Sequence, residues 1–224
     1  MQFTVLHFEE RMFYTLLIDA IVLTGSSRDH EIDYGKRMLA RSSIVTSAML
    51  LECCANLCSA GLSHSGNKTT LQKFREAALN TYQKQLDTRE QDVAAADELR
   101  KIRNKYVHSW AQQHPVEPAT DTPHGIGEVH PETWPLARIS RSPSLWSTED
   151  AIAVLRIARN FLHYYFIRLL QLTPDTIFTM LATSVKLSSG DTGPIAESAL
   201  EHHLRFAAHE LSVDFSFLTS TSAA

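Results

Sequence analysis

The stretch SIVTSAMLLECCANLCSA, residues 43–60, decides the fold because it is long, apolar and almost free of charge. From Ser42 to Leu62 the only charged side chain is Glu52. A helix of this kind is covered on several sides, so we expect a helix over about residues 32–62 to form the centre of the domain. Its Ser, Thr, Asn and Glu side chains argue against a membrane span.

Helical patterns continue on both sides of this segment. Ser147, with Asp150 three residues later, resembles a capping box, and the apolar run IAVLRIARNFLHYYFIRLLQL follows it at residues 152–172. No segment alternates like a strand, and there is no internal repeat, so we predict an all-α protein, an up-and-down helical bundle with additional N- and C-terminal helices. The other predicted helices cover about residues 4–23, 70–84, 92–110, 174–186 and 194–211.

The prolines divide the chain. Six of the eight lie between Trp110 and Ser147, a stretch that cannot sustain a helix. We therefore expect an N-terminal helical extension at residues 1–31 and a C-terminal helical extension at residues 173–224. The central bundle at residues 32–172 then carries a proline-rich insertion at residues 111–146, interpreted as a solvated loop.

Charge and cysteine content restrict the class of protein. The 21 basic and 25 acidic side chains give a net charge of -4, which excludes a broad cationic surface for nucleic acid or membrane. The three cysteines all lie at residues 53–58, so no disulfide framework spans the chain. The N-terminus lacks a basic region followed by a long apolar run. These features predict a soluble cytoplasmic protein that does not bind membranes.

The segment ELRKIRNKYVHSW, residues 98–110, carries the most chemistry, because it concentrates positive charge in an acidic protein. At about 100° per residue, Leu99, Ile102 and Tyr106 belong to one apolar stripe, and Arg103 falls about 40° from Leu99 rather than on the opposite, solvated face. A buried guanidinium needs a partner. Arg103 is therefore expected to pair with a carboxylate, for which Glu52 is the obvious candidate, or to face a cavity or a subunit interface.

The hexapeptide RNKYVH, residues 103–108, resembles the R-x-x-x-x-H motif of the HEPN superfamily. A polar residue commonly follows the arginine in that motif, as Asn104 does here. HEPN domains are four-helix bundles in which the motif lies near the end of an inner helix, after an apolar helix like residues 43–60. The resemblance implies a HEPN-like core at roughly residues 32–172.

The resemblance also implies a function, that of a metal-independent endoribonuclease without a cofactor, typical of toxins and abortive-infection (phage-defence) effectors. Such enzymes act as homodimers with the site at the interface. His108 would move protons near neutral pH, and Arg103 would hold phosphoryl oxygens while RNA is cut through a 2′,3′-cyclic phosphate. Asn104 would orient the imidazole or bind phosphate, and Lys105 and Tyr106 are candidate substrate-binding residues.

The spacing of the pair explains why a dimer is expected. On a regular helix Arg103 and His108 are separated by about 140° around the axis and about 7.5 Å along it, whereas Asn104 and His108 share a face. A two-fold axis beside this helix would bring two arginines and two histidines into one groove. An acid and a base would then come from different subunits.

One position departs from part of the family. In HEPN toxins paired with nucleotidyltransferase antitoxins, a tyrosine that becomes AMPylated stands two residues after the histidine, and here Trp110 occupies that position. An antitoxin protein stays a possible partner, but AMPylation at this position is not expected.

Other interpretations stay open. The chain could be a non-catalytic HEPN-like module that dimerises or binds RNA or another protein. Arg156 and His163, with Arg159 between them, form a rival pair, although the apolar residues around them indicate packing. Glu52 fits a structural ion pair better than a catalytic acid.

Candidate metal ligands are few and poorly spaced. Cys54 and Cys58 share a helical face without a third ligand nearby. The proline-rich insertion holds His114, His124 and His130, whose spacing matches no recognisable metal-binding pattern. The histidines of the late helix, His202, His203 and His209, are expected at the surface. We therefore predict no metal site.

Overall fold

The computed structural model describes residues 5–60, 67–107, 116–118, 126–129, 132–187, 192–195 and 199–220. These residues are predominantly helical, as the all-α prediction requires. The α-helices among them are α1 (Phe13–Asp29), α2 (Asp33–Cys58), α3 (Thr70–Tyr82), α4 (Gln91–Val107), α5 (Thr148–His163), α6 (Pro174–Leu181) and α7 (Leu200–Glu210).

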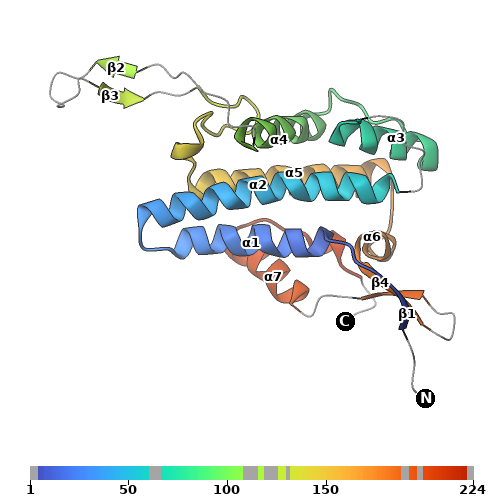
Figure 1. Cartoon of the computed structure of the whole chain (residues 1–224). Coiled ribbons are helices and arrows are strands. Elements are labelled where there is room, and N and C mark those ends of the chain that lie inside the picture. The colour runs from blue at the N-terminus through green and yellow to red at the C-terminus, as the bar shows by residue number, and fades with distance from the viewer. Residues whose placement is uncertain are drawn as a thin grey trace.

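Helix α2 lies at the centre of the molecule, as its uncharged sequence predicts. It packs against α1, α3, α4 and α5, and Figure 1 shows α2 and α5 running side by side with α3 and α4 on one side and α1 on the other. Its side chains Ile44, Leu50 and Cys54 are almost completely buried. Burial also raises the pKa of the Cys54 thiol, so this cysteine stays protonated and behaves as a core residue.

Among the described residues, α2 is the one helix whose length and apolar composition would suffice to cross a membrane. Half of its apolar window is buried against the rest of the protein. The core helix of a soluble protein has the same properties, so this helix is compatible with a soluble protein.

Helix α5 begins at the predicted capping box. The Ser147 backbone N–H donates to the Asp150 carboxylate at 2.9 Å, and the Asp150 N–H donates to the Ser147 hydroxyl at 3.3 Å. The helix continues into a π-helix, η2 (Tyr164–Leu169). Phe161 and Tyr165 are fully buried there and meet Phe74 of α3, with ring centroids 4.9 Å and 4.7 Å from that of Phe74. This aromatic cluster joins α3 to α5.

Strands occur in segments that were predicted to be helices or loop. β1 (Val5–Glu9), β4 (Thr183–Leu187) and β5 (Thr192–Ile195) form an antiparallel sheet in the order β1-β4-β5. β2 (Val116–Pro118) and β3 (Ile126–Val129) form an antiparallel pair within the proline-rich insertion, away from the helices in Figure 1. These strands are short. The pairs β2–β3 and β4–β5 join neighbouring segments, whereas β1 pairs with β4 from the other end of the sequence, a contact that a local pattern does not reveal.

The sheet moves three predicted helix boundaries. The predicted helix at 4–23 is wrong at its start, because β1 precedes α1, which extends to Asp29. The predicted helix at 174–186 ends at Leu181, where β4 follows, and the one predicted at 194–211 begins at Leu200, after β5. Val185 of β4 pairs with Phe8 of β1 on one side and with Gly193 of β5 on the other. The same sheet therefore ends the helix predicted at 174–186 early and delays the start of the helix predicted at 194–211.

The predicted N- and C-terminal extensions share the core of the central bundle. Phe13, Leu17 and Ile21 of α1 are fully buried and belong to the same hydrophobic cluster as the residues of α2 and α5. Leu218, near the C-terminal end of the described chain, belongs to it as well, and the Tyr14 hydroxyl donates to its carbonyl. The segment boundaries proposed from sequence therefore separate parts that pack together.

The end of the proline-rich insertion is folded onto α4. Its residues 132–146 were interpreted as solvated loop, but Ile139 and Trp146 are buried, and Thr133 pairs with Ser140 in an isolated β-bridge. The buried carboxylate of Glu98 on α4 accepts the backbone N–H groups of Leu136 and Ala137 at 3.0 Å and 2.6 Å. One side chain of α4 thus fixes this segment, called the anchored loop below.

Replacing Glu98 with alanine is expected to lower the free energy of unfolding by about 2–3 kcal/mol, because a buried backbone N–H loses its acceptor. Glu98→Gln keeps an acceptor oxygen in the same place and should cost about 1 kcal/mol. Urea denaturation measures both. The exposed Glu149→Ala on α5 is the control, and a Glu98→Ala protein as stable as this control would show that the contact does not hold the loop.

Candidate functional site

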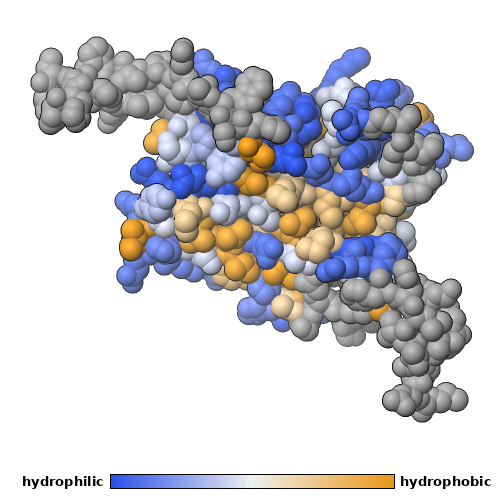
Figure 2. Space-filling view, viewed as in Figure 1, coloured by the Kyte–Doolittle hydropathy of each residue, from blue (hydrophilic) through white to orange (hydrophobic). Residues whose placement is uncertain are grey.

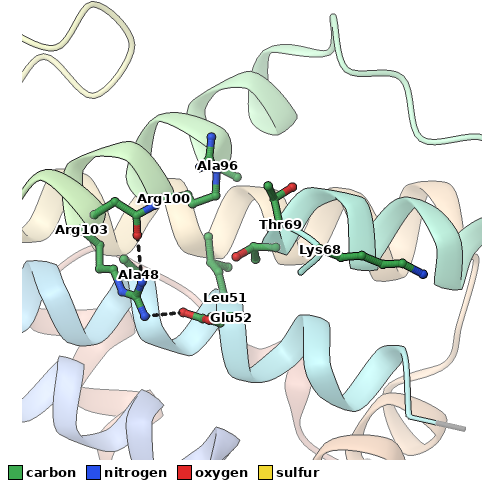
Figure 3. A pocket seen from close by; sticks show the side chains of 10 residues that line it. Ala48, Leu51, Glu52, Lys68, Thr69, Ala96, Arg100 and Arg103 are labelled. Atoms are coloured by element: carbon green, nitrogen blue, oxygen red, sulfur yellow. Dashed lines mark hydrogen bonds and ion pairs between the residues drawn. The ribbon is translucent and has the colours of Figure 1, made fainter. Parts of the chain in front are cut away.

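Arg103 makes the ion pair that the sequence predicts. It lies on α4 directly after the buried Ile102 and one turn after the buried Leu99, and its side chain is 29% exposed. Its guanidinium Nη2 donates to Glu52 Oε2 on α2 at 2.7 Å, as Figure 3 shows. The half-buried pair joins the two helices and fixes the direction of the guanidinium.

Asn104 provides a second contact to the same group. Arg103 Nη1 donates to Asn104 Oδ1 at 2.8 Å, so the amide holds the arginine. Asn104 is also predicted to orient the imidazole of His108. His108 lies outside the described residues, which in this part of the chain end at Val107. The structure therefore brings together Arg103, Asn104 and Glu52.

These three residues line a pocket of about 160 Å³ between α2, α3 and α4 (Figure 3). Its apolar wall comes from α2 and α4, and one side is closed by the start of α3, where Thr69 and Gln72 form a capping box. The full lining is Ala48, Leu51, Glu52, Lys68, Thr69, Thr70, Ala96, Arg100, Arg103 and Asn104.

The cations of the pocket are each paired with a carboxylate. Arg100 Nε lies 2.9 Å from Asp97 Oδ1. The same carboxylate lies 2.8 Å from Nζ of Lys101, which is outside the pocket lining. Lys68 Nζ lies 2.6 Å from Glu76, and Figure 3 shows the Lys68 side chain extending away from the centre of the pocket. The ion pairs thus hold these side chains in place, and the carboxylates balance their positive charge.

The ion pairs of Asp97 predict a pH dependence of stability. Burial alone would raise the pKa of this carboxyl, but hydrogen bonds from Lys101 and Arg100 outweigh it and hold the pKa below the usual 3.8. A lowered pKa in the folded state stabilises the protein above the usual value, and the contribution is lost as the pH falls through the folded-state value.

We therefore expect the free energy of unfolding of wild type to exceed that of Asp97→Asn near neutral pH, and the difference to shrink below about pH 4. Denaturant titrations at a series of pH values measure this difference. A difference that stays constant from neutral pH into this acid range would contradict the assignment.

The predicted substrate-binding residues face the anchored loop instead of the pocket. Lys105 Nζ lies 5.7 Å from the centroid of the Trp134 ring. The ring of Tyr106 stacks on that of Trp146, with centroids 5.6 Å apart and an interplanar angle of 29°. Both residues follow Arg103 on α4, so pocket and anchored loop are neighbouring parts of one surface.

Of the rival arginine–histidine pair on α5, only the histidine is engaged in packing. Arg156 is exposed, whereas Arg159 Nε donates to the Asp214 carbonyl at 2.8 Å. The ring of His163 meets that of Phe217 edge to face at 5.2 Å. Burial and the nearby guanidinium groups lower the pKa of His163, so its neutral form is favoured.

The remaining candidates are the histidines and cysteines considered as metal ligands. Within the described part of the chain, no three His, Cys, Asp or Glu side chains gather in a way that would hold a metal ion. His114, His124 and His130 lie outside the described residues. His202 and His209 of α7 are exposed, as predicted, and His203 is half-buried.

Sequence reasoning did not find the contributions of Lys68, Thr69 and Arg100 to the pocket, nor those of Trp134 and Trp146 beside α4. The capping-box pattern of Thr69 and Gln72 indicates the start of a helix in the sequence. Nothing in the local sequence indicates that this helix end faces Arg103, because that contact depends on how α2, α3 and α4 pack.

Comparison of the chain with models of known protein families, with curated protein sequences and with solved structures gave no significant match.

Proposed function

We propose that this chain is a HEPN-type endoribonuclease that needs no metal and acts as a homodimer in the cytoplasm, as a toxin or phage-defence effector. It cleaves RNA by attack of a ribose 2′-hydroxyl on the adjacent phosphate, which leaves a 2′,3′-cyclic phosphate and a free 5′-hydroxyl. An antitoxin protein that restrains this activity is a further proposed partner.

The observation that carries the proposal is the fixed guanidinium of Arg103. The bonds to Glu52 and Asn104 use two of its five N–H donors, one on each terminal nitrogen. The remaining donors are available to two oxygens of a phosphate. A donor group already held in place loses little entropy when negative charge develops on those oxygens, which is how such groups stabilise a transition state.

Proton transfer is assigned to His108. A histidine titrates near neutral pH, so it can accept the proton of the 2′-hydroxyl or donate one to the leaving 5′-oxygen. Glu52 acts in this scheme by holding Arg103 and takes no proton. The histidine of the second subunit performs the opposite transfer across the two-fold axis.

An exposed apolar face supports a dimer. Val22 of α1 and Met38 and Met49 of α2 are between 41% and 46% exposed, and Figure 2 shows apolar surface across α1 and α2. Glu52, which lines the pocket, is three residues after Met49 and therefore its neighbour on the surface of α2, so this face adjoins the candidate site. Contiguous apolar surface of this kind marks association surfaces.

The alternative is a non-catalytic HEPN-like module for dimerisation or for binding RNA or protein. The pairing of each pocket cation with a carboxylate favours it, because an ion pair that serves stability alone has the same geometry. Such a module would bind a partner without forming cyclic-phosphate products.

The test is incubation of the purified protein with RNA in EDTA, followed by identification of the product ends. The proposal expects cleavage with 2′,3′-cyclic phosphate and 5′-hydroxyl ends, and loss of this cleavage in His108→Ala. Absence of cleavage by the wild-type protein with any RNA, or cleavage unchanged in His108→Ala, would reject it.

A further inference from the structure

The surface formed by the end of α4 and the anchored loop carries aromatic rings next to cations. Three residues of α4, namely Glu98, Lys105 and Tyr106, each contact a residue of the loop segment 132–146. The two segments therefore present one surface. It begins at Arg103 and extends away from the pocket.

Tyr106 is an exposed ring on a rigid support. It is 38% exposed, whereas Trp146 behind it is 1% exposed and donates its indole N–H to the Ser140 carbonyl at 2.7 Å. A buried, hydrogen-bonded indole fixes the plane of the tyrosine that stacks on it. The exposed part of the Tyr106 ring thus forms a flat surface of defined orientation.

Cations lie around a second ring nearby. Lys105 Nζ and the Arg141 guanidinium lie 5.7 Å and 5.3 Å from the centroid of Trp134. Arg141 also pairs with the exposed carboxylate of Glu132. Although the whole chain has a net charge of -4, basic residues outnumber acidic ones on the described part of this surface. It holds Arg100, Lys101, Arg103, Lys105, Arg138 and Arg141 against Asp97, Glu98, Glu132 and Glu52, the partner of Arg103.

This combination fits single-stranded nucleic acid better than other ligands. Proteins bind unpaired strands by stacking bases on aromatic rings and by contacting phosphates with nearby cations. A duplex has its bases stacked inside and cannot cover an isolated ring. Tyr106 is three residues from Arg103, about 4.5 Å along the helix axis, so both can contact the same short stretch of strand.

We propose that Tyr106 stacks an unpaired base of single-stranded RNA next to the phosphate held by Arg103, while Lys105 and Arg141 contact neighbouring phosphates. The inference rests on the proposed function for the identity of the ligand and deepens it, because it assigns single-stranded RNA as the substrate class. Glu98 is a positioning residue here, since it fixes the loop that carries Arg141.

The test measures binding without cleavage. A short fluorescein-labelled RNA with 2′-O-methyl groups, which removes the attacking hydroxyl, is titrated with the full-length protein as single strand and as duplex, and the anisotropy gives Kd. We expect the wild type to prefer the single strand. Tyr106→Ala should raise Kd about 5- to 150-fold, since stacking of one base accounts for a change of this size.

Matched variants separate stacking from other effects. Tyr106→Phe keeps the ring and should bind like the wild type, and Tyr34→Ala, which removes a 71% exposed tyrosine of α2, should leave Kd unchanged. Lys105→Ala and Arg141→Ala should each lower the slope of log Kd against log salt by about 0.7. A Tyr106→Ala protein that binds like the wild type, or a duplex bound as tightly as the single strand, would overturn the inference.

Failure of this inference can be distinguished from failure of the ribonuclease proposal. A chain that cleaves RNA but binds the single strand independently of Tyr106 refutes this inference alone. A chain that binds through Tyr106 but never cleaves refutes the ribonuclease proposal and leaves a single-strand RNA-binding module.

Discussion

Replacing Arg103 with alanine is expected to lower the rate of RNA cleavage by about 10²- to 10³-fold, the usual cost of removing one preorganised donor to a charged transition state. Arg103→Lys should be similarly impaired, because a lysine cannot reach Glu52, Asn104 and a phosphate with one planar group. Initial rates with a fluorogenic RNA substrate measure the change, and circular dichroism checks that the helices remain.

Arg156→Ala is the matched control, since it removes an exposed arginine from α5 and tests the rival pair at the same time. We expect full activity from this variant. Activity lost in Arg156→Ala but retained in Arg103→Ala would move the site to α5. Equal activity in both variants would show that neither arginine contributes to the reaction.

Replacing Phe161 with alanine is expected to have the largest effect on stability. Phe161 is fully buried and meets both Phe74 and Tyr165, so the truncation leaves a cavity between α3 and α5. The expected loss is about 3–5 kcal/mol in the free energy of unfolding. Because α3 also supplies Thr69 and Thr70 to the pocket, loosening this cluster should disturb the site as well.

Urea denaturation measures this loss. Phe161→Leu retains most of the volume and should lose about 1 kcal/mol. The exposed Leu79→Ala on α3 should change stability by less than about 0.5 kcal/mol. If Phe161→Ala were no less stable than Leu79→Ala, the aromatic cluster would not be the connection between α3 and α5.

Much of the helical framework could be predicted from the sequence because the signals are local. The uncharged run around Glu52 predicts the central helix, and the Ser147–Asp150 capping box marks the start of α5. The apolar stripe of α4 places Arg103 toward the interior, and a guanidinium there requires a carboxylate such as Glu52. Each of these inferences depends on residues within one helix or on the cost of an unpaired buried charge.

The pairing of β1 with β4 and the anchored loop could not be predicted because they depend on distant partners. Val185 of β4 adopts an extended conformation opposite Phe8 of β1, which lies near the other end of the sequence. Glu98 holds residues 136 and 137, which lie within the proline-rich insertion, whose composition suggested a solvated loop. For the same reason, the support of Tyr106 by Trp146 was not visible from the motif.

The central claim is that an arginine and a histidine from two copies of the chain act on one phosphodiester. Its most direct test is complementation: Arg103→Ala and His108→Ala chains are co-expressed with different tags, and the hybrid is isolated by two successive affinity steps. A hybrid dimer retains one intact Arg103 and one intact His108 on opposite subunits. We predict that it cleaves faster than either parent protein, because each parent lacks one of the two groups altogether, but more slowly than the wild type, because only one of the two histidines remains. Failure of the two chains to copurify, or a hybrid as inactive as its parents beside an active wild type, would contradict the claim.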